Sequence, residues 1–145
     1  MLARQKGDGS PKALAQLRAE LGRAALEVGR IDEAVALLEE ASAALGKMEP
    51  TATPQQAEVW LALGRARLRQ GRVAEGLAQI EAADAFWRAF EPEHAQAGET
   101  AYWLGHAQAQ AGNKRAAQLQ LARATPLLAA STWPMLQQLM TVVRN

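Results

Sequence analysis

The chain has 145 residues, which is enough for one domain of ordinary size. Its 16 lysine and arginine residues nearly balance 15 aspartate and glutamate residues, so it lacks the excess positive charge that draws proteins to nucleic acids or anionic membranes. It contains no cysteine, which excludes disulfides, thiolate nucleophiles and thiolate metal ligands.

The first ten residues, MLARQKGDGS, contain neither a long apolar run nor a small-residue cleavage site. No stretch of about 18 uninterrupted apolar residues, the length that spans a bilayer, occurs in the chain. We therefore expect a soluble, cytoplasmic protein without a membrane partner.

Three stretches of the chain share one pattern, in which Leu-Gly is followed by Arg or His, Ala, four variable residues and Gly. They are LGRAALEVG at 21–29, LGRARLRQG at 63–71 and LGHAQAQAG at 104–112. The glycines at the second place are Gly22, Gly64 and Gly105, so the pattern recurs at nearly constant intervals of about 42 residues. A period of this length indicates a repeat protein built from stacked helical or mixed units.

Prolines are predicted to begin four helices, because the first helical residue needs no backbone N–H. The four dipeptides are Ser10-Pro11, Thr53-Pro54, Glu91-Pro92 and Trp133-Pro134. Ser10 and Thr53 are expected to be N-caps, since a hydroxyl oxygen can accept a hydrogen bond from an unpaired N–H of the first turn.

Glycines are predicted to end the first helix of each repeat. These glycines, which can adopt the left-handed conformation that closes a helix, are Gly29, Gly71 and Gly112. Second helices are expected to begin almost at once, at residues 31, 73 and 114. Apolar residues recur three and four positions apart along them, and one small residue in each allows close approach of the paired helix: Ala34, Gly76 and Ala117.

Pro126 lies within the third of these second helices. A proline inside a helix removes one hydrogen bond and clashes with the preceding turn. We expect the helix to kink or end near Thr125, and a simple loop that begins there fits the sequence equally well.

The predicted fold is all-α: a right-handed α-solenoid of three helix hairpins followed by a C-terminal capping helix. One helix pair alone would expose its apolar face, so stacking is needed to make the core continuous. The repeats are expected at about 11–46, 54–89 and 92–130, and the capping helix at about 133–144, within a single domain over 1–145. Counting back one period from residues 43–51 reaches residues 1–9, so residues 1–10 are interpreted as the tail of a missing preceding repeat.

The repeated positions resemble the tetratricopeptide repeat (TPR) family over roughly residues 11–130. The resemblance is carried by Leu21, Gly22, Gly29, Ala34 and Ala41, by Leu63, Gly64, Gly71, Gly76 and Ala83, and by Leu104, Gly105, Gly112, Ala117 and Ala124, with Trp60 at a place where the family often has Trp. The period is similar to that of the longer variety found in kinesin light chains and many bacterial regulators. Ala25, Arg67 and Gln108 stand where the family usually has a large aromatic residue, and Phe86, Trp87 and Trp103 are expected to supply that bulk.

The resemblance implies a concave groove that binds peptides, lined by the residue after each Leu-Gly and by those three and four positions beyond. In this chain the implied groove residues are Arg23, Glu27, Arg65, Leu68, Arg69, Tyr102, His106 and Gln110. Arg67 would point elsewhere, because alternate residues of a helix lie on different faces. Glu20, Glu58 and Glu99 would lie near the same surface.

Two interpretations of these charges remain open. A groove of mixed sign suits a peptide or helix with its own carboxylates, which arginine can hold with two hydrogen bonds. Alternatively, the charges are solvated and form local pairs worth a few tenths of a kcal/mol each. The Lys and Asn residues with which one TPR subclass clamps a C-terminal carboxylate are absent, since the corresponding places hold Ala19, Arg23, Ala62, Glu99 and Trp103.

The predicted C-terminal helix is apolar on more than one face, which is unusual for the end of a soluble solenoid. We expect it to form an interface with a second copy or a further domain, through Trp133, Leu136, Leu139, Met140 and Val143.

Residues that could support catalysis are few. His94 and His106 would not share a face of one helix and are unsuited to bind one metal ion, and Glu91, Glu93 and His94 have no accompanying nucleophile or phosphate-binding loop. We expect no enzyme activity, cofactor, metal or nucleic-acid partner. The sequence favours a protein–protein interaction scaffold, such as the interaction module of a bacterial regulator, with a structural oligomerisation module as the alternative.

Overall fold

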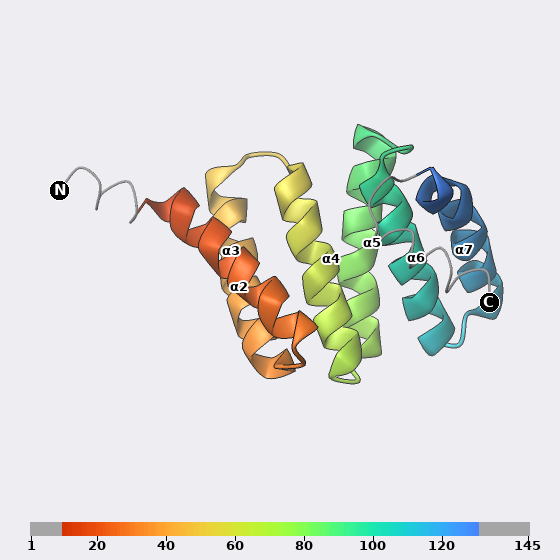
Figure 1. Ribbon diagram of the computed structural model, residues 1–145, viewed down its shortest axis with the longest axis horizontal. Helices are drawn as coiled ribbons and strands as arrows, with labels where there is room; N and C mark the ends of the chain where they lie inside the picture. Colours follow the sequence, from red (N-terminus) through yellow and green to blue (C-terminus); the bar gives the residue numbers. More distant parts are fainter. Residues whose placement is uncertain (1–9, 131–145) are drawn as a thin grey trace.

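The computed structural model describes residues 10–130, which form six α-helices joined by short turns (Figure 1). The helices come in three pairs: α2 (Pro11–Glu27) with α3 (Ile31–Met48), α4 (Pro54–Arg69) with α5 (Val73–Phe90), and α6 (Ala95–Gln110) with α7 (Lys114–Ala129). No strand occurs within these residues. The predicted all-α solenoid of three helix hairpins is thus confirmed, whereas the predicted capping helix at 133–144 lies outside the described residues.

The three pairs stack in one row along the long axis of the molecule (Figure 1). Each pair packs on the next through α3 against α4 and α5 against α6, and the first helices also touch one another, α2 against α4 and α4 against α6. Within residues 10–130 the backbones of the second helices α3, α5 and α7 do not meet, although Arg123 of α7 reaches Asp84 of α5. Because only the first helices approach one another, they line the inner side of the curved stack. None of the described helices is long and apolar enough to cross a membrane.

The same turn closes the first helix of every pair. Gly29, Gly71 and Gly112 have φ values of 86°, 82° and 90°, the left-handed region that glycine reaches without a steric penalty. In the first turn, the N–H of Gly29 donates to Leu26 O at 3.1 Å and the N–H of Arg30 donates to Ala25 O at 2.8 Å. This pair of bonds, which recurs in the other two turns, defines the Schellman motif. The second helices begin at residues 31, 73 and 114, as predicted.

The prolines give a more varied result. Ser10 Oγ accepts from the N–H of Ala13 at 3.0 Å and Thr53 Oγ1 from the N–H of Gln56 at 3.2 Å, so both predicted N-caps are confirmed. The helix start predicted at Pro92 is wrong, because α6 begins at Ala95. His94 is its N-cap, and the ring Nδ1 accepts from the N–H of Gln96 at 2.9 Å.

The predicted helix end or loop start near Thr125 is wrong, since α7 continues through Pro126 to Ala129; a kink at this point stays a prediction. Ala124 and Leu128, on either side of the proline, are completely buried in the core between α6 and α7. Burial of these side chains holds the turn in place and outweighs the hydrogen bond that proline removes.

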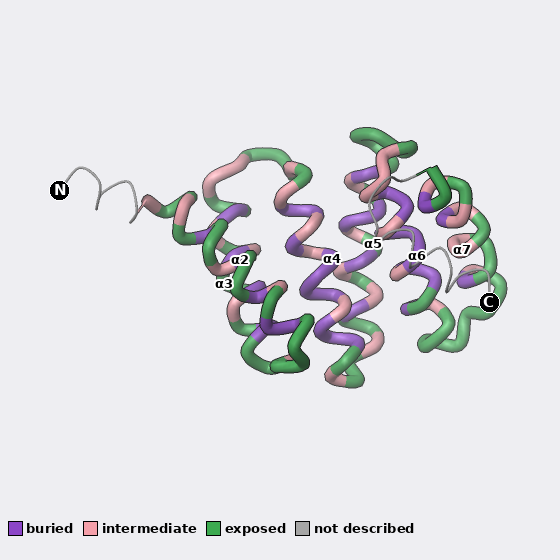
Figure 2. Tube along the Cα trace, viewed as in Figure 1, coloured by how far each residue is buried: buried purple, intermediate pink, exposed green. Residues whose placement is uncertain are grey.

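Close approach of the two helices defines each pair. A Cβ added to Gly64 would lie 2.5 Å from Ile80 Cγ1 and 2.8 Å from the carbonyl oxygen of Gly76, and one added to Gly22 would lie 2.7 Å from Leu38 Cγ. Gly105 stands in the same relation to Leu121 and to Ala117 O, at 3.0 and 3.1 Å. Buried residues accordingly follow the helix faces that look at one another, and α4 in the middle of the stack is the most enclosed (Figure 2).

The outer face of α2 is apolar and exposed. Leu17 and Leu21 are 53% and 49% exposed, and Leu14 and Val28 continue the same stripe. The residues one period later, Val59 and Leu63 of α4, are buried in a core cluster shared with α3. On α4 the equivalent face packs against α3. The stripe on α2 therefore resembles a face on which a further helix would stack.

Replacing Gly64 with alanine should lower the free energy of unfolding by about 1–3 kcal/mol, because the new methyl group overlaps a backbone oxygen and a core side chain. Urea denaturation measures this change. Gly46→Ala is the matched control, since a Cβ there meets only the Gln56 amide nitrogen at 3.5 Å; helix propensity predicts that it raises stability by up to about 1 kcal/mol. Equal stability of Gly64→Ala and the wild type would contradict the close approach.

Candidate functional site

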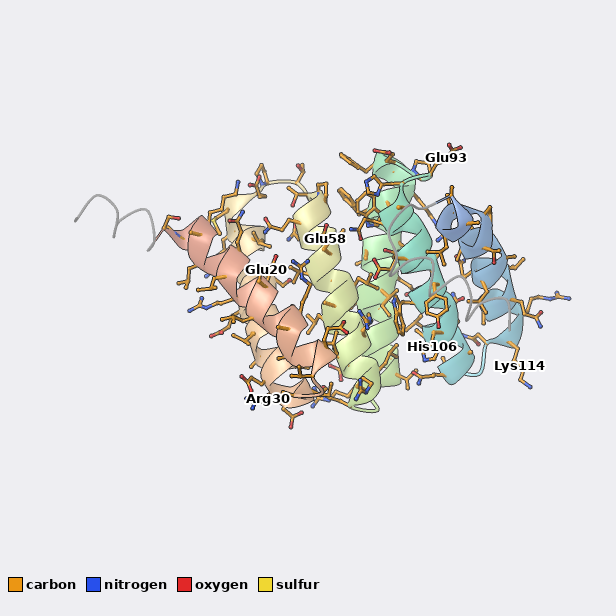
Figure 3. The ribbon with its side chains drawn as sticks, in the orientation of Figure 1. Glu20, Arg30, Glu58, Glu93, His106 and Lys114 are labelled. Carbon is orange, nitrogen blue, oxygen red and sulfur yellow. The ribbon has the colours of Figure 1, made fainter. Side chains whose placement is uncertain are left out.

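A cavity of about 340 Å³ opens on the inner side of the stack, where three helices converge. Arg23 comes from α2, Leu61 and Arg65 from α4, and Gln96 and Glu99 from α6; Glu58 and Ala62 complete the lining. In Figure 3, Glu20 of α2 and Glu58 of α4, which both contact Arg23, lie close to one another, while His106 lies farther along α6.

A second, smaller cavity of about 80 Å³ adjoins the first, because Arg65 lines both. Its other lining residues are Leu26, Leu68, Arg69, Trp103, His106 and Gln110. We call the two cavities together the inner groove. It contains both apolar surface and charged groups, so it could hold a ligand by burial and orient it by charge.

Ion pairs within the protein occupy the groove's two central arginines. Arg23 Nη1 donates to Glu58 Oε1 at 2.8 Å, and its Nη2 donates to Glu20. Arg65 Nη2 lies 3.7 Å from Glu27 Oε2, and the Arg65 guanidinium carbon lies 4.2 Å from the centre of the Trp103 ring. The second contact is a cation–π interaction, which grows stronger away from water.

Glu99 differs from the other carboxylates of the groove, because no side chain among residues 10–130 forms an ion pair with it. Burial raises the pKa of the Glu99 carboxyl, Arg65 opposes this shift, and the neighbouring carboxylate of Glu58 adds to it. Burial likewise lowers the pKa of Arg65, while Glu27 and Glu99 oppose that change. Both charges are therefore held away from water at some energetic cost.

Most of the residues that the resemblance assigned to a groove line the inner groove. These are Arg23, Arg65, Leu68, Arg69, His106 and Gln110, and Glu27 contacts Arg65 from its rim. Tyr102 is instead 8% exposed and packs against Ala124 and Leu128 in the core of the third pair. Burial also raises its pKa.

Arg67 points away from the groove, as the helical spacing predicted. It pairs with Glu39 of α3 and, at 3.1 Å, with Glu75 of α5. It stands where the family usually has a large aromatic residue, and there it links α4 to the helices on both sides.

The groove also contains residues that were not among the implied groove residues: Gln96, Trp103, and the carboxylates Glu58 and Glu99, which the sequence placed only near the same surface. A signal for two of them was present, since Glu58 and Glu99 are separated by one repeat period and so occupy equivalent places in successive repeats. Residues predicted for the C-terminal interface, from Trp133 to Val143, lie outside the described residues.

The two histidines occupy separate places. His94 stacks on Trp87 with ring centres 4.8 Å apart, and His106 lies near Tyr102 and Trp103 at the groove. Among the described residues, no three His, Asp or Glu side chains gather closely enough to hold a metal ion.

Comparison with known proteins links the chain to tetratricopeptide repeats. The tetratricopeptide repeat family model matches residues 19–90. A crystal structure from Podosopora anserina, described as kinesin light chain nearly identical TPR-like repeats, is 24% identical with a TM-score of 0.75, over 93% of this chain and 67% of that one. A variant of the same protein is also 24% identical, with a TM-score of 0.74, over 92% of this chain and 66% of that one. This chain therefore spans about two thirds of the length of each. No curated protein matches the sequence.

Replacing Glu99 with glutamine should stabilise the protein at neutral pH. A carboxyl whose pKa is raised by folding binds its proton more tightly in the folded state, so the stability it contributes is present below its ordinary pKa of 4.5 and is lost as pH rises through the raised value. In urea denaturation, the wild type and the variant should therefore have equal free energies of unfolding at about pH 4, and the variant should have the larger one at about pH 7. Glu81→Gln on α5, an exposed carboxylate, should show no such growing difference. A Glu99→Gln variant less stable than the wild type at neutral pH would contradict the assignment.

Proposed function

We propose, from the premise that this chain belongs to the tetratricopeptide repeat family over residues 19–90, that it is a scaffold whose inner groove binds a segment of a partner protein. Tetratricopeptide repeat proteins mediate protein–protein interactions, and their fold is typically a non-catalytic scaffold. The bound segment is an extended peptide or one face of a helix.

The observation that carries this proposal is the convergence of three helices on two adjoining cavities that share Arg65. A surface built by different repeats keeps its shape only while the repeats remain stacked, so it is as rigid as the stack itself. Apolar walls from Leu61, Ala62 and Leu68 offer burial, and the charged groups between them offer selectivity.

We also propose that the chain serves as the interaction module of a regulator in the bacterial cytoplasm. The support is the spacing of the Leu-Gly motifs at 21, 63 and 104, which resembles that of the long-period repeats in such regulators. Catalysis, a cofactor and a nucleic-acid partner have no place in this proposal.

Filling the larger cavity tests the proposed function without regard to the charge of the partner. Gln96→Trp places a large side chain in the lining of that cavity and should reduce partner recovery at least tenfold in quantitative affinity capture from a lysate of the source cells. Gln118→Trp, an exposed change on α7 that lines neither cavity, is the control and should leave recovery unchanged. Circular dichroism checks the folding of both variants. Recovery of the same proteins with all three baits would reject the groove as the binding surface.

Self-association is a second candidate function, and the exposed stripe on α2 favours it. Leu14, Leu17, Leu21 and Val28 form a long apolar surface, and such surfaces commonly mark interfaces. We propose that the apolar residues near the other end of the chain are its counterpart, which would make the contact head to tail: Trp133, Leu136, Leu139, Met140 and Val143.

Leu17→Glu should abolish this self-association, because it places a charge in the centre of the stripe. Sedimentation velocity at high micromolar concentration should then show a single monomer. Leu119→Glu, a change at an exposed leucine of α7, should leave the association of the wild type unchanged. A strictly monomeric wild type would remove this candidate.

A further inference from the structure

The groove's central arginines are poorly placed to receive a carboxylate from a partner. Arg23 already donates to both Glu20 and Glu58, and Arg65 is engaged by Glu27 and by the Trp103 ring. A carboxylate that entered the groove would exchange one ion pair for another and would leave a protein carboxylate unpaired, so the net gain in binding energy would be small.

A basic group of a partner, in contrast, would find a carboxylate that has no ion pair within the described residues. Glu58 and Glu99 line the larger cavity together with Arg23 and Arg65, and Glu20 and Glu27 contact these arginines from outside the lining. Glu20, Glu27 and Glu58 each pair with an arginine, and Glu99 pairs with no residue of the described chain. Glu99 is therefore the carboxylate of the cavity lining that has no ion pair within residues 10–130, and it lies in the wall contributed by α6.

Glu99 has also lost much of its contact with water through folding, as the direction of its pKa shift indicates. A cation that binds Glu99 would replace contacts with water that folding has already removed, so the carboxylate would pay a smaller desolvation cost than an exposed one. Leu61 and Ala62 line the same cavity, and apolar surface of this kind suits the methylene stem of a long basic side chain.

From this arrangement we infer that the inner groove selects a partner segment that inserts a lysine or arginine side chain into the larger cavity, where its charged group binds the Glu99 carboxylate. The inference rests on the proposed function, since it assigns the chemistry of the segment that the groove binds. It differs from the first of the two interpretations of the sequence, in which the groove's arginines hold carboxylates of the partner.

A phage-displayed library of random short peptides, panned on the immobilised full chain, tests both statements separately. Wild-type protein should select peptides enriched in lysine or arginine at one position, and Gln96→Trp should select none of them. Binding of one selected peptide is then measured by fluorescence polarisation to the wild type, Glu99→Gln and the control Glu81→Gln.

Glu99→Gln in the protein removes one side of the charged pair, and replacing the peptide's lysine with glutamine removes the other. Each change alone should weaken binding about tenfold or more. Making both changes should weaken it little further, because each removes the same interaction. Glu81→Gln should bind as the wild type does. Circular dichroism should show Glu99→Gln to be folded, so that a loss of affinity is not a loss of structure.

Three results would overturn the inference. In the first, the selected peptides are enriched in aspartate or glutamate and bind Glu99→Gln more tightly than the wild type; in the second, they bind both proteins equally and have no basic position. In these two cases the groove still binds peptides and only the assigned chemistry fails. In the third result, either no peptide is selected or every selected peptide also binds Gln96→Trp. That result would reject the groove function itself, and the inference with it.

Discussion

Each helix pair is built on a close approach at the glycine of its Leu-Gly motif, and the approach is tightest at Gly64. At Gly64 the backbone of α4 lies so near to α5 that an added methyl group would overlap the carbonyl oxygen of Gly76. The pair can then bury Ile80 between its helices, and close packing of such side chains is the main source of stability for a short helix. Gly22 and Gly105 make the equivalent approach to Leu38 and Leu121. The shared Leu-Gly motif therefore marks the same close approach in all three pairs, and the groove lies where the first helices of these pairs converge.

Sequence reasoning predicted the solenoid well because its strongest signals are local. A glycine with positive φ closes a helix by bonds to residues only a few positions away, so the starts of the second helices followed directly. The helix boundaries predicted from two prolines were wrong, because the neighbouring cap or contacts with another helix determined the structure there. At Pro92 the chain forms a turn before a histidine cap, and His is seldom the first choice at that position. At Pro126 the burial of Ala124 and Leu128 against α6 decides that the helix continues, and no local pattern reveals this burial.

The site was predictable in position and much less so in chemistry. The repeat period places Arg23, Arg65 and His106 at equivalent points of three first helices, and all three line the inner groove. Which charges are already paired depends on contacts between helices, such as that of Arg23 on α2 with Glu58 on α4. Tyr102 shows the same limit, because the third pair uses it as a core residue. Spacing along one helix therefore identified the surface but did not identify the unpaired group on it.

Asp84 and Glu99 show how differently this fold treats two carboxylates that are withdrawn from water. Asp84, only 6% exposed, accepts from Arg88 of its own helix at 2.7 Å and from Arg123 of α7, so both of its oxygens are bound. It joins α5 to α7, whose backbones do not meet, so residues of this chain satisfy its charge. Glu99 joins nothing within residues 10–130, yet burial acts on it strongly enough to raise its pKa. A neutral side chain of the same size would avoid that cost. The contrast supports a function for Glu99 that is completed by a group from outside the chain, in the part of the described surface where three repeats converge.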